Sequence, residues 1–355
     1  MNSALAANPN AAPDDAANTA PNGSPMAARN GLLAIIGGSG LYELPGLRDT
    51  AWVAVPTPWG EPSDQILTGT LPTPAGPARL AILPSHGRGH RLAPSAINYR
   101  ANIAALKILG ATDVLSLSAV GSLRADLPPG TFVIVDQFID RTVAREKSFF
   151  GPGLVAHVSM ARPVCQRLGD HLQAALEGRV TRQGTGQGTG QSTAHRTAPD
   201  VRSALPVPQV PYVPHVPHVR GGTYLAMEGP QFSTLAESRL YRSWNCDCVG
   251  MTNMPEAALA REAELCYASV AMVTDFDCWH AQHADVTVQA IVLMLGRNAD
   301  AARALVADAA GTIAQDPAGA TCACRHALDH ALITAPGARD PAVVQRLRGI
   351  AGRVL

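Results

Sequence analysis

Short apolar runs alternate with longer helical periods along most of the chain, and this alternation restricts the fold more than any other feature. Seven runs rich in Val, Ile and Leu have the length of buried strands: residues 32–38, 78–84, 112–120, 131–139, 223–229, 246–251 and 267–275. Helical periods lie between several of them, at 95–110, 162–178 and 287–311. We therefore expect an α/β fold, in which a single domain has a central mixed, mostly parallel twisted sheet flanked by helices.

Three segments stand outside this alternation. Residues 1–30, rich in Ala, Asn and Pro, predict a disordered N-terminal tail. Residues 179–220 join a QGTGQGTGQ tract to a VPQVPYVPHVPHV tract, which predicts a low-complexity Gly/Pro-rich insert; we interpret His215 and His218 within it as solvated side chains. The expected domain is then 31–178 together with 221–335, and residues 336–355 form a C-terminal extension that suits a terminal amphipathic helix.

Charge and cysteine content exclude several classes of function. The 28 Lys and Arg residues balance 28 Asp and Glu residues, so the basic surface of a nucleic-acid binder is not expected. No apolar stretch has the length of a membrane span, and no secretory signal stands out, so we expect a cytoplasmic protein. The cysteine pairs 246/248 and 322/324 lack the spacing and the partners of a zinc site, and we interpret them as ordinary thiols, with no metal bound.

Small and hydroxylic residues follow three of the predicted strands. Ser39 lies in the GGSG that ends the first, Ser85 and His86 begin a Gly-rich loop after the second, and Ser118 and Ala119 end the third. Each end alone is explained as well by a tight turn or by loop residues hydrogen-bonded to the backbone. In sheets of this kind ligands bind at strand ends, where amide and hydroxyl donors converge, and the three ends together favour a phosphate site.

The stretch CYASVAMVTDFDCWH, residues 266–280, runs a hydrophobic strand into Asp275 and Asp277. In an extended segment residues i and i+2 point the same way, so the two carboxyls can face one ligand. They could equally cap the next helix or pair with arginines.

Nine motifs, in order over about residues 33–178 and 222–300, resemble those of the 5'-methylthioadenosine phosphorylases, within the purine nucleoside phosphorylase family. They are AIIGGSGLYELPGL, TPWGEPSD, SHGRGH, NYRANIAALK, SAVGSLR, VIVDQFIDRT, MEGPQFST, MTNMPEAALARE and YASVAMVTDFDCW. The resemblance implies a nucleoside phosphorylase-like fold and phosphorolysis of methylthioadenosine to adenine and 5-methylthioribose 1-phosphate. It implies inorganic phosphate as co-substrate, no cofactor, and a homotrimer with the active site at the subunit interface.

The resemblance also implies roles for the two aspartates. Cleavage of the C1'–N9 bond leaves negative charge on the purine, so a carboxylic acid with a raised pKa is needed to protonate N7. Asp277 matches this catalytic acid, and Asp275 would accept from the 6-amino group. Together with Ser233 they match the pattern for a 6-aminopurine, because a carboxylate facing O6 would oppose two acceptors.

The remaining contacts carry over by motif. Phosphate-binding positions are Ser39, Ser85, His86, Ser118, Ala119 and Thr252. Ser85 stands where the family usually has an arginine, and a hydroxyl cannot supply a bidentate charged contact, so Arg88 or Arg100 would have to reach in. Substrate-binding positions are Met251 on the ribose, Phe232 and Ser233 near the base, the methylthio pocket of Val286, Val288 and Ile291, and His157 from a neighbouring subunit.

Three alternatives remain open at this stage. The fold also suits a phosphorylase of 6-oxopurine nucleosides such as inosine or methylthioinosine, or a phosphate-independent nucleosidase. A non-catalytic nucleoside sensor is the third, and the intact carboxylate pair argues against it.

Overall fold

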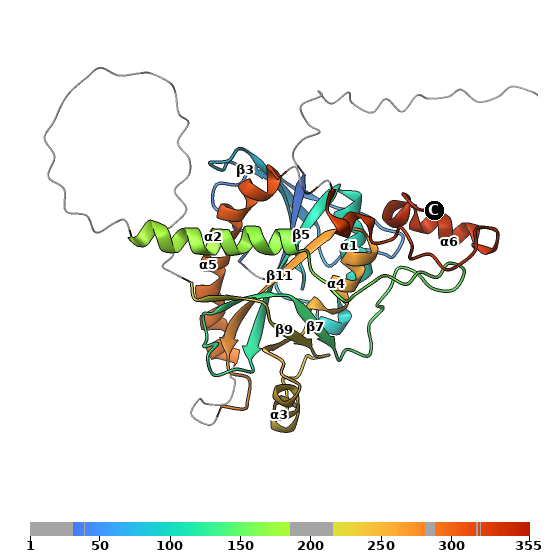
Figure 1. The fold of residues 1–355 in the computed structure, drawn as a ribbon. Helices are drawn as coiled ribbons and strands as arrows, with labels where there is room; N and C mark the ends of the chain where they lie inside the picture. Colours follow the sequence, from blue (N-terminus) through green and yellow to red (C-terminus); the bar gives the residue numbers. More distant parts are fainter. Residues whose placement is uncertain (1–30, 39, 185–215, 281–287, 317–318, 320) are drawn as a thin grey trace, which may run out of the picture.

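The computed structural model describes residues 31–38, 40–184, 216–280, 288–316, 319 and 321–355, and its strands form one mixed sheet (Figure 1). The strands are β1 (Leu32–Gly37), β2 (Arg48–Val53), β3 (Ile66–Leu71), β4 (Ala78–Pro84), β5 (Ala111–Ser122), β6 (Phe132–Val135), β7 (Gln137–Asp140), β8 (His218–Arg220), β9 (Thr223–Ala226), β10 (Cys248–Gly250) and β11 (Cys266–Asp275).

The sheet is mixed and mostly parallel, as predicted. Its strand order is β2-β3-β4-β1-β5-β10-β9-β7, with β11 beside β5, β6 beside β11 and β8 beside β6. The inner pairs β4–β1, β1–β5 and β5–β11 are parallel, whereas β2–β3, β3–β4, β5–β10 and β6–β11 are antiparallel. Because β5 pairs with β11 and, at Gly121 and Ser122, with β10, the sheet divides at the end of β5.

Six α-helices are present in the described residues, and both faces of the sheet carry helices. They are α1 (Tyr99–Ile108), α2 (Gln166–Gly184), α3 (Leu235–Ser243), α4 (Asn253–Glu262), α5 (Val288–Ala314) and α6 (Pro341–Ala351). In Figure 1, α2 crosses α5 on one side of the sheet, α1 and α4 lie together on the other, and α3 projects away from it. None of these helices is long and apolar enough to cross a membrane.

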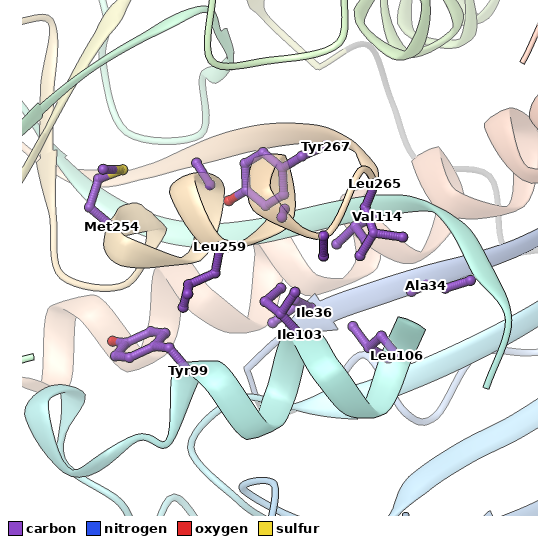
Figure 2. Close-up of a cluster of buried hydrophobic side chains, with 14 of the residues drawn as sticks. Ala34, Ile36, Tyr99, Ile103, Leu106, Val114, Met254, Leu259, Leu265 and Tyr267 are labelled. Atoms are coloured by element: carbon purple, nitrogen blue, oxygen red, sulfur yellow. The ribbon is translucent and has the colours of Figure 1, made fainter. Parts of the chain in front are cut away.

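The continuous apolar run of β1 follows from burial on both faces. Successive side chains of a strand point to opposite sides, so Leu33 and Ile35 pack with α2 and α5, while Ala34 and Ile36 pack with α1 and α4. Figure 2 shows the second of these cores, where Ile36 meets side chains of α1 and α4. Each large side chain buried in this way stabilises the fold by about 1.5–3 kcal/mol.

The predicted insert is narrower than expected. Helix α2 continues to Gly184, and β8 begins at His218 and pairs with β6, so both ends of the predicted segment 179–220 belong to regular structure. His218 is therefore a strand residue rather than a side chain of a solvated insert. His215 and the N-terminal residues 1–30 lie outside the described residues.

The C-terminal extension forms α6, as its amphipathic pattern indicates. The Asp340 side chain caps the helix by accepting from the backbone N–H groups of Ala342 and Val343, and Leu347 and Ile350 are buried against the core that contains α1. Residues 336–355 thus pack on the main body of the protein.

Candidate active site

Asp275 ends β11, and Asp277 follows it in a tight turn. The backbone of Asp277 has a left-handed φ of +50°, and its N–H donates to Asp275 Oδ1 at 2.8 Å. The Thr274 hydroxyl lies 2.7 Å from Asp275 Oδ2. The sequence interpretation, in which both aspartates point the same way along an extended strand, is therefore wrong about the cause: a turn held by Asp275 brings the pair together.

Gly121 of β5 makes room for this turn. It pairs with Asp275 in the sheet, and a Cβ atom at residue 121 would lie 2.9 Å from Asp275 Oδ1 and 3.2 Å from Asp277 Cβ. Contacts that short would displace the two aspartates. Glycine at this position thus allows both acids to pack directly against the end of β5.

The environment of the pair raises the pKa of both carboxyls. Burial raises the pKa of Asp275, against the opposing effect of the hydrogen bonds from Thr274 and the Asp277 N–H. Burial also raises the pKa of Asp277; the charge of Asp275 adds to this, and the Ser238 and Ser233 hydroxyls lower it in part. Oδ2 of Asp277 is buried and has no partner at hydrogen-bond geometry among the described residues, so it is available to a ligand.

The side chains of Ser118 and Thr252, two of the residues predicted to bind phosphate, lie close together beside β5. Ser118 Oγ lies 3.4 Å from Thr252 Oγ1 and 3.2 Å from the hydroxyl of buried Tyr224, and the Thr252 N–H donates to that same hydroxyl at 3.3 Å. Ser118 and Gly121 are three residues apart, or about 10 Å along β5. The hydroxyl cluster and the aspartate pair therefore lie against the same strand, about 10 Å apart.

The other predicted phosphate loop lies beside them. Gly37 at the end of β1 pairs with Pro84 of β4 and with Leu117 of β5, so Ser85, which follows β4, and Ser118, within β5, each come directly after a partner of Gly37. Ser118 and Ala119 lie inside β5, which continues to Ser122, so they do not end the strand as predicted. The convergence of these segments on one anion stays a prediction.

His86 is held in one orientation by its backbone contact. Its Nδ1 lies 2.9 Å from the carbonyl oxygen of Leu92, and its ring stacks on His90 with centroids 4.2 Å apart. Burial lowers the pKa of His86, and the charge of Arg145 acts in the same direction. A neutral imidazole that donates from Nδ1 has Nε2 as an acceptor, which suits the P–OH of hydrogen phosphate.

Neither arginine expected to replace the missing one reaches the phosphate residues. Arg88 forms a 2.8 Å ion pair with Asp64 and lies over the Trp52 ring, and Arg100 lies 3.5 Å from Glu146. The Ser85 hydroxyl donates to the Gly37 carbonyl oxygen at 3.3 Å. In this structure the Ser85 hydroxyl therefore joins the ends of β4 and β1.

Met251 is positioned by Arg145, which the sequence interpretation missed. The guanidinium of Arg145 is 1% exposed and donates to the carbonyl oxygens of Met251 and Met254, at 2.5 and 2.8 Å. It also pairs with Glu228, whose carboxylate accepts from the Val143 N–H at 2.5 Å. Nothing in the local sequence around Arg145 indicates this role, because the carbonyl groups that it binds come from segments about 80 to 110 residues away.

A buried polar network lies beneath the site. The Asn253 side chain donates to the Tyr267 hydroxyl at 2.7 Å and accepts from Ser269, and Tyr267 donates to Glu256 at 2.8 Å. Burial raises the pKa of Glu256 to about 7. These bonds tie α4, and hence Thr252 at its start, to β11.

The residues predicted to surround the nucleoside differ in their exposure and in their distance from Asp277. Ser233 lies close enough to affect the pKa of Asp277, whereas Phe232 is 47% exposed and Ile291, on the first turn of α5, is half-buried. Val288 is the first residue of α5, and Ser39 and Val286 lie outside the described residues.

Within one chain, His157 does not lie near Asp275 and Asp277. It is exposed, and its N–H donates to Ala331. Leu328, in the same C-terminal stretch, donates to Glu264, which precedes β11, so this region lies at the end of β11 opposite Asp275.

The amino-acid sequence is similar to a known family and to named relatives. The pattern of the family described as "Phosphorylase superfamily" matches residues 32–310. The chain is 52% identical to the S-methyl-5'-thioadenosine phosphorylase of Rhodospirillum rubrum, over 93% of this chain and 99% of the relative. It is 51% identical to the protein of the same name from Bradyrhizobium diazoefficiens, over 91% and 98%.

Solved structures agree with these relatives. The crystal structure of a methylthioadenosine phosphorylase from an antarctic soil metagenomic library is similar with a TM-score of 0.75 and 40% identity, covering 91% of this chain and 99% of that one. Methylthioadenosine phosphorylase from Schistosoma mansoni in complex with adenine has a TM-score of 0.69 and 33% identity, covering 84% and 97%.

Proposed function

The chain belongs to the phosphorylase superfamily, and on that premise we propose that it cleaves S-methyl-5'-thioadenosine with inorganic phosphate, giving adenine and 5-methylthioribose 1-phosphate. The observation that carries the proposal is the buried Asp277, whose Oδ2 lacks a partner among the described residues, beside Asp275 and at the end of the strand that carries Ser118. Relatives named for this activity support it.

In the proposed reaction Asp277 is the acid that protonates the leaving purine. An oxygen of phosphate forms a bond to C1' of the sugar while the C1'–N9 bond breaks and its electron pair moves into the purine. Asp277 gives its proton to N7, so adenine leaves as a neutral base and Asp277 becomes a carboxylate. The raised pKa of Asp277 keeps the proton available until the purine becomes basic enough to take it.

Asp275 supports the same step and selects the base. Its two oxygens already accept from Thr274 and from the Asp277 N–H, and each has a second lone pair. One of these accepts from the 6-amino group of adenine. A 6-oxopurine would place its own acceptor there, so we expect methylthioadenosine to be preferred over inosine.

Phosphate is bound in this proposal by neutral groups. The hydroxyls of Ser118 and Thr252 and the N–H of Ala119 donate, and Nε2 of His86 accepts from the P–OH. Because Arg88 and Arg100 are paired elsewhere, no bidentate arginine contact is included. Phosphate acts as co-substrate, and the reaction as written requires no cofactor.

The rest of the nucleoside is assigned by motif. Met251, held by Arg145, packs on the ribose, and Phe232 and Ser233 line the base. Val286, Val288 and Ile291 form the pocket for the methylthio group. We propose that the enzyme is a cytoplasmic homotrimer in which His157 of a neighbouring subunit closes this pocket, which fits its exposure and its distance from Asp275 within one chain.

One assay tests the proposal. Methylthioadenosine, adenosine and inosine are incubated with the full chain, with and without phosphate, and free base is measured. We expect adenine from methylthioadenosine only when phosphate is present. Equal release without phosphate would indicate a nucleosidase, a preference for inosine an oxopurine enzyme, and no release from any substrate a binding protein; each result would overturn the proposal.

A further inference from the structure

Four cysteines from three separate parts of the chain meet on the α2 and α5 side of the sheet. Cys165 directly precedes α2, Cys266 begins β11, and Cys322 and Cys324 follow α5. Their sulfur atoms all lie within 4.8 Å of one another, and three of the four residues are buried. The two partners of the C-x-C pair are about 60 and 160 residues away in sequence, so the spacing of Cys322 and Cys324 alone did not indicate them.

The separations between the sulfurs fit one tetrahedral ion. Two ligands at about 2.3 Å from zinc lie about 3.8 Å apart in a regular tetrahedron. Cys165 Sγ lies 3.6 Å from Cys322 Sγ, and the full set lies within 4.8 Å. A disulfide needs about 2.05 Å, and all four thiols are free. A cluster of several irons would hold its cysteine sulfurs further apart than one ion does.

Two guanidinium groups stand beside the cluster, Arg167 near Cys266 and Arg261 near Cys324. Nε of Arg167 and Nε of Arg261 are buried and have no hydrogen-bond partner among the described residues. Arg167 also pairs with Asp113 and Asp316, which hold it next to Cys266. Metal-bound thiolates accept hydrogen bonds from such neighbouring groups, and these contacts stabilise the site.

We propose that Cys165, Cys266, Cys322 and Cys324 bind one zinc ion as a structural tetrathiolate site. Binding replaces four S–H bonds with four Zn–S bonds and releases four protons, with no change of oxidation state. The ion ties the segment after α5 to the start of β11. Since β11 rises about 3.3 Å per residue, the ion lies about 30 Å from Asp275 at the other end of the strand and takes no part in cleavage.

Metal analysis of the full chain tests this directly. Protein purified with reductant and without chelator is expected to contain about one zinc per chain. Exchange with cobalt(II) should give the visible absorption of a tetrahedral cobalt tetrathiolate, which requires no variant. A strong chelator should lower the melting temperature, and added zinc should restore it.

Variants identify the ligands. The double substitution Cys322→Ser with Cys324→Ser is expected to reduce the zinc content at least tenfold, whereas Cys246→Ser, a buried cysteine outside the cluster, should leave it unchanged. Wild-type protein that holds no zinc and gives no cobalt spectrum would overturn the proposal. So would an intact mass and thiol count showing a disulfide among the four cysteines in the reduced preparation.

Discussion

The backbone N–H of Asp277 donates a 2.8 Å hydrogen bond to Oδ1 of Asp275, so one carboxyl fixes the turn that carries the other. The two residues therefore have different tasks in the proposed reaction. Asp275 positions the turn and accepts a hydrogen bond from the 6-amino group of the base. Asp277, whose Oδ2 has no partner among the described residues, carries the proton that is transferred to N7.

Replacing the proposed acid should remove most of the activity. Asp277→Asn keeps the size of the side chain and an N–H donor but has no proton to transfer. We expect kcat for methylthioadenosine to fall by roughly 10² to 10⁴-fold, with a smaller change in KM. In the wild type kcat should also decline as the pH rises through the raised pKa of Asp277, since only the protonated form donates. A variant with wild-type kcat would rule out Asp277 as the acid.

Asp275→Asn tests the choice of base. The amide can donate to O6, which the carboxylate cannot, so the ratio of kcat/KM for methylthioadenosine over inosine should fall by about tenfold or more. An unchanged ratio would show that Asp275 does not contact the 6-position. Steady-state kinetics with both nucleosides at saturating phosphate give the answer.

Gly121→Ala should disturb the pair without removing a polar group. The added Cβ would meet Asp275 Oδ1 at 2.9 Å and Asp277 Cβ at 3.2 Å, so the turn must shift. A shift of about 1 Å in a catalytic group can lower kcat/KM by about 10²-fold, and these contacts require a smaller shift, so we expect a loss below that factor. The control is Gly178→Ala in α2, where nothing lies within 4 Å of the new atom, and kcat/KM should stay at the wild-type value. Equal activity of the two variants would contradict the packing described here.

Phosphate binding should depend on the hydroxyls of Ser118 and Thr252. Removing one hydrogen bond of about 1.4 kcal/mol changes affinity about tenfold, so Ser118→Ala and Thr252→Val should each raise the KM for phosphate by about that factor. Thr252→Ser keeps the hydroxyl and should behave almost as wild type. If Thr252→Val leaves the KM for phosphate unchanged while it alters the KM for the nucleoside, Thr252 does not contact the anion.

Stability should fall as the pH rises from about 4.5 to about 7. Burial raises the pKa of Glu256 to about 7 from its ordinary 4.5, so in this window the folded state binds more protons than the unfolded state. Glu262, with a pKa also raised to about 7, acts in the same direction. The contribution of Glu256 to this decline in the free energy of unfolding is at most about 3 kcal/mol. Urea unfolding at pH 5 and pH 7 measures it, and Glu256→Gln should make the decline smaller; an identical decline would show that Glu256 does not titrate there.

Local patterns in the sequence predict much of the fold because burial sets them. The run at 78–84 coincides with β4, and the run at 267–275 lies within β11, since a strand covered on both faces must be apolar throughout. Helix boundaries that depend on capping are harder to predict. The sequence suggests that α1 begins at Ser95, but the Ser95 hydroxyl bonds Glu228. The helix begins after Asn98, whose side chain accepts from the Ala101 N–H. Strands β2 and β3 have mixed exposure, and their weak pattern was missed.

The sequence predicts the site residues that belong to a motif. It does not predict contacts that form where distant segments meet. The aspartates and Ser118 could be named from sequence, but the left-handed turn at Asp277 depends on its fit against Gly121. Likewise Arg145 holds Met251 and Met254 through their carbonyl groups, which any residue type provides. Such contacts depend on the whole fold and have no local signal.

A crystal structure of the full chain with adenine and phosphate bound is the most direct test of the central claim. We expect Asp277 Oδ2 at about 3 Å from N7, Asp275 in contact with the 6-amino group, and phosphate beside Ser118 and Thr252. Adenine bound elsewhere, or bound here with both carboxyls turned toward solvent or toward arginine, would contradict the proposed mechanism.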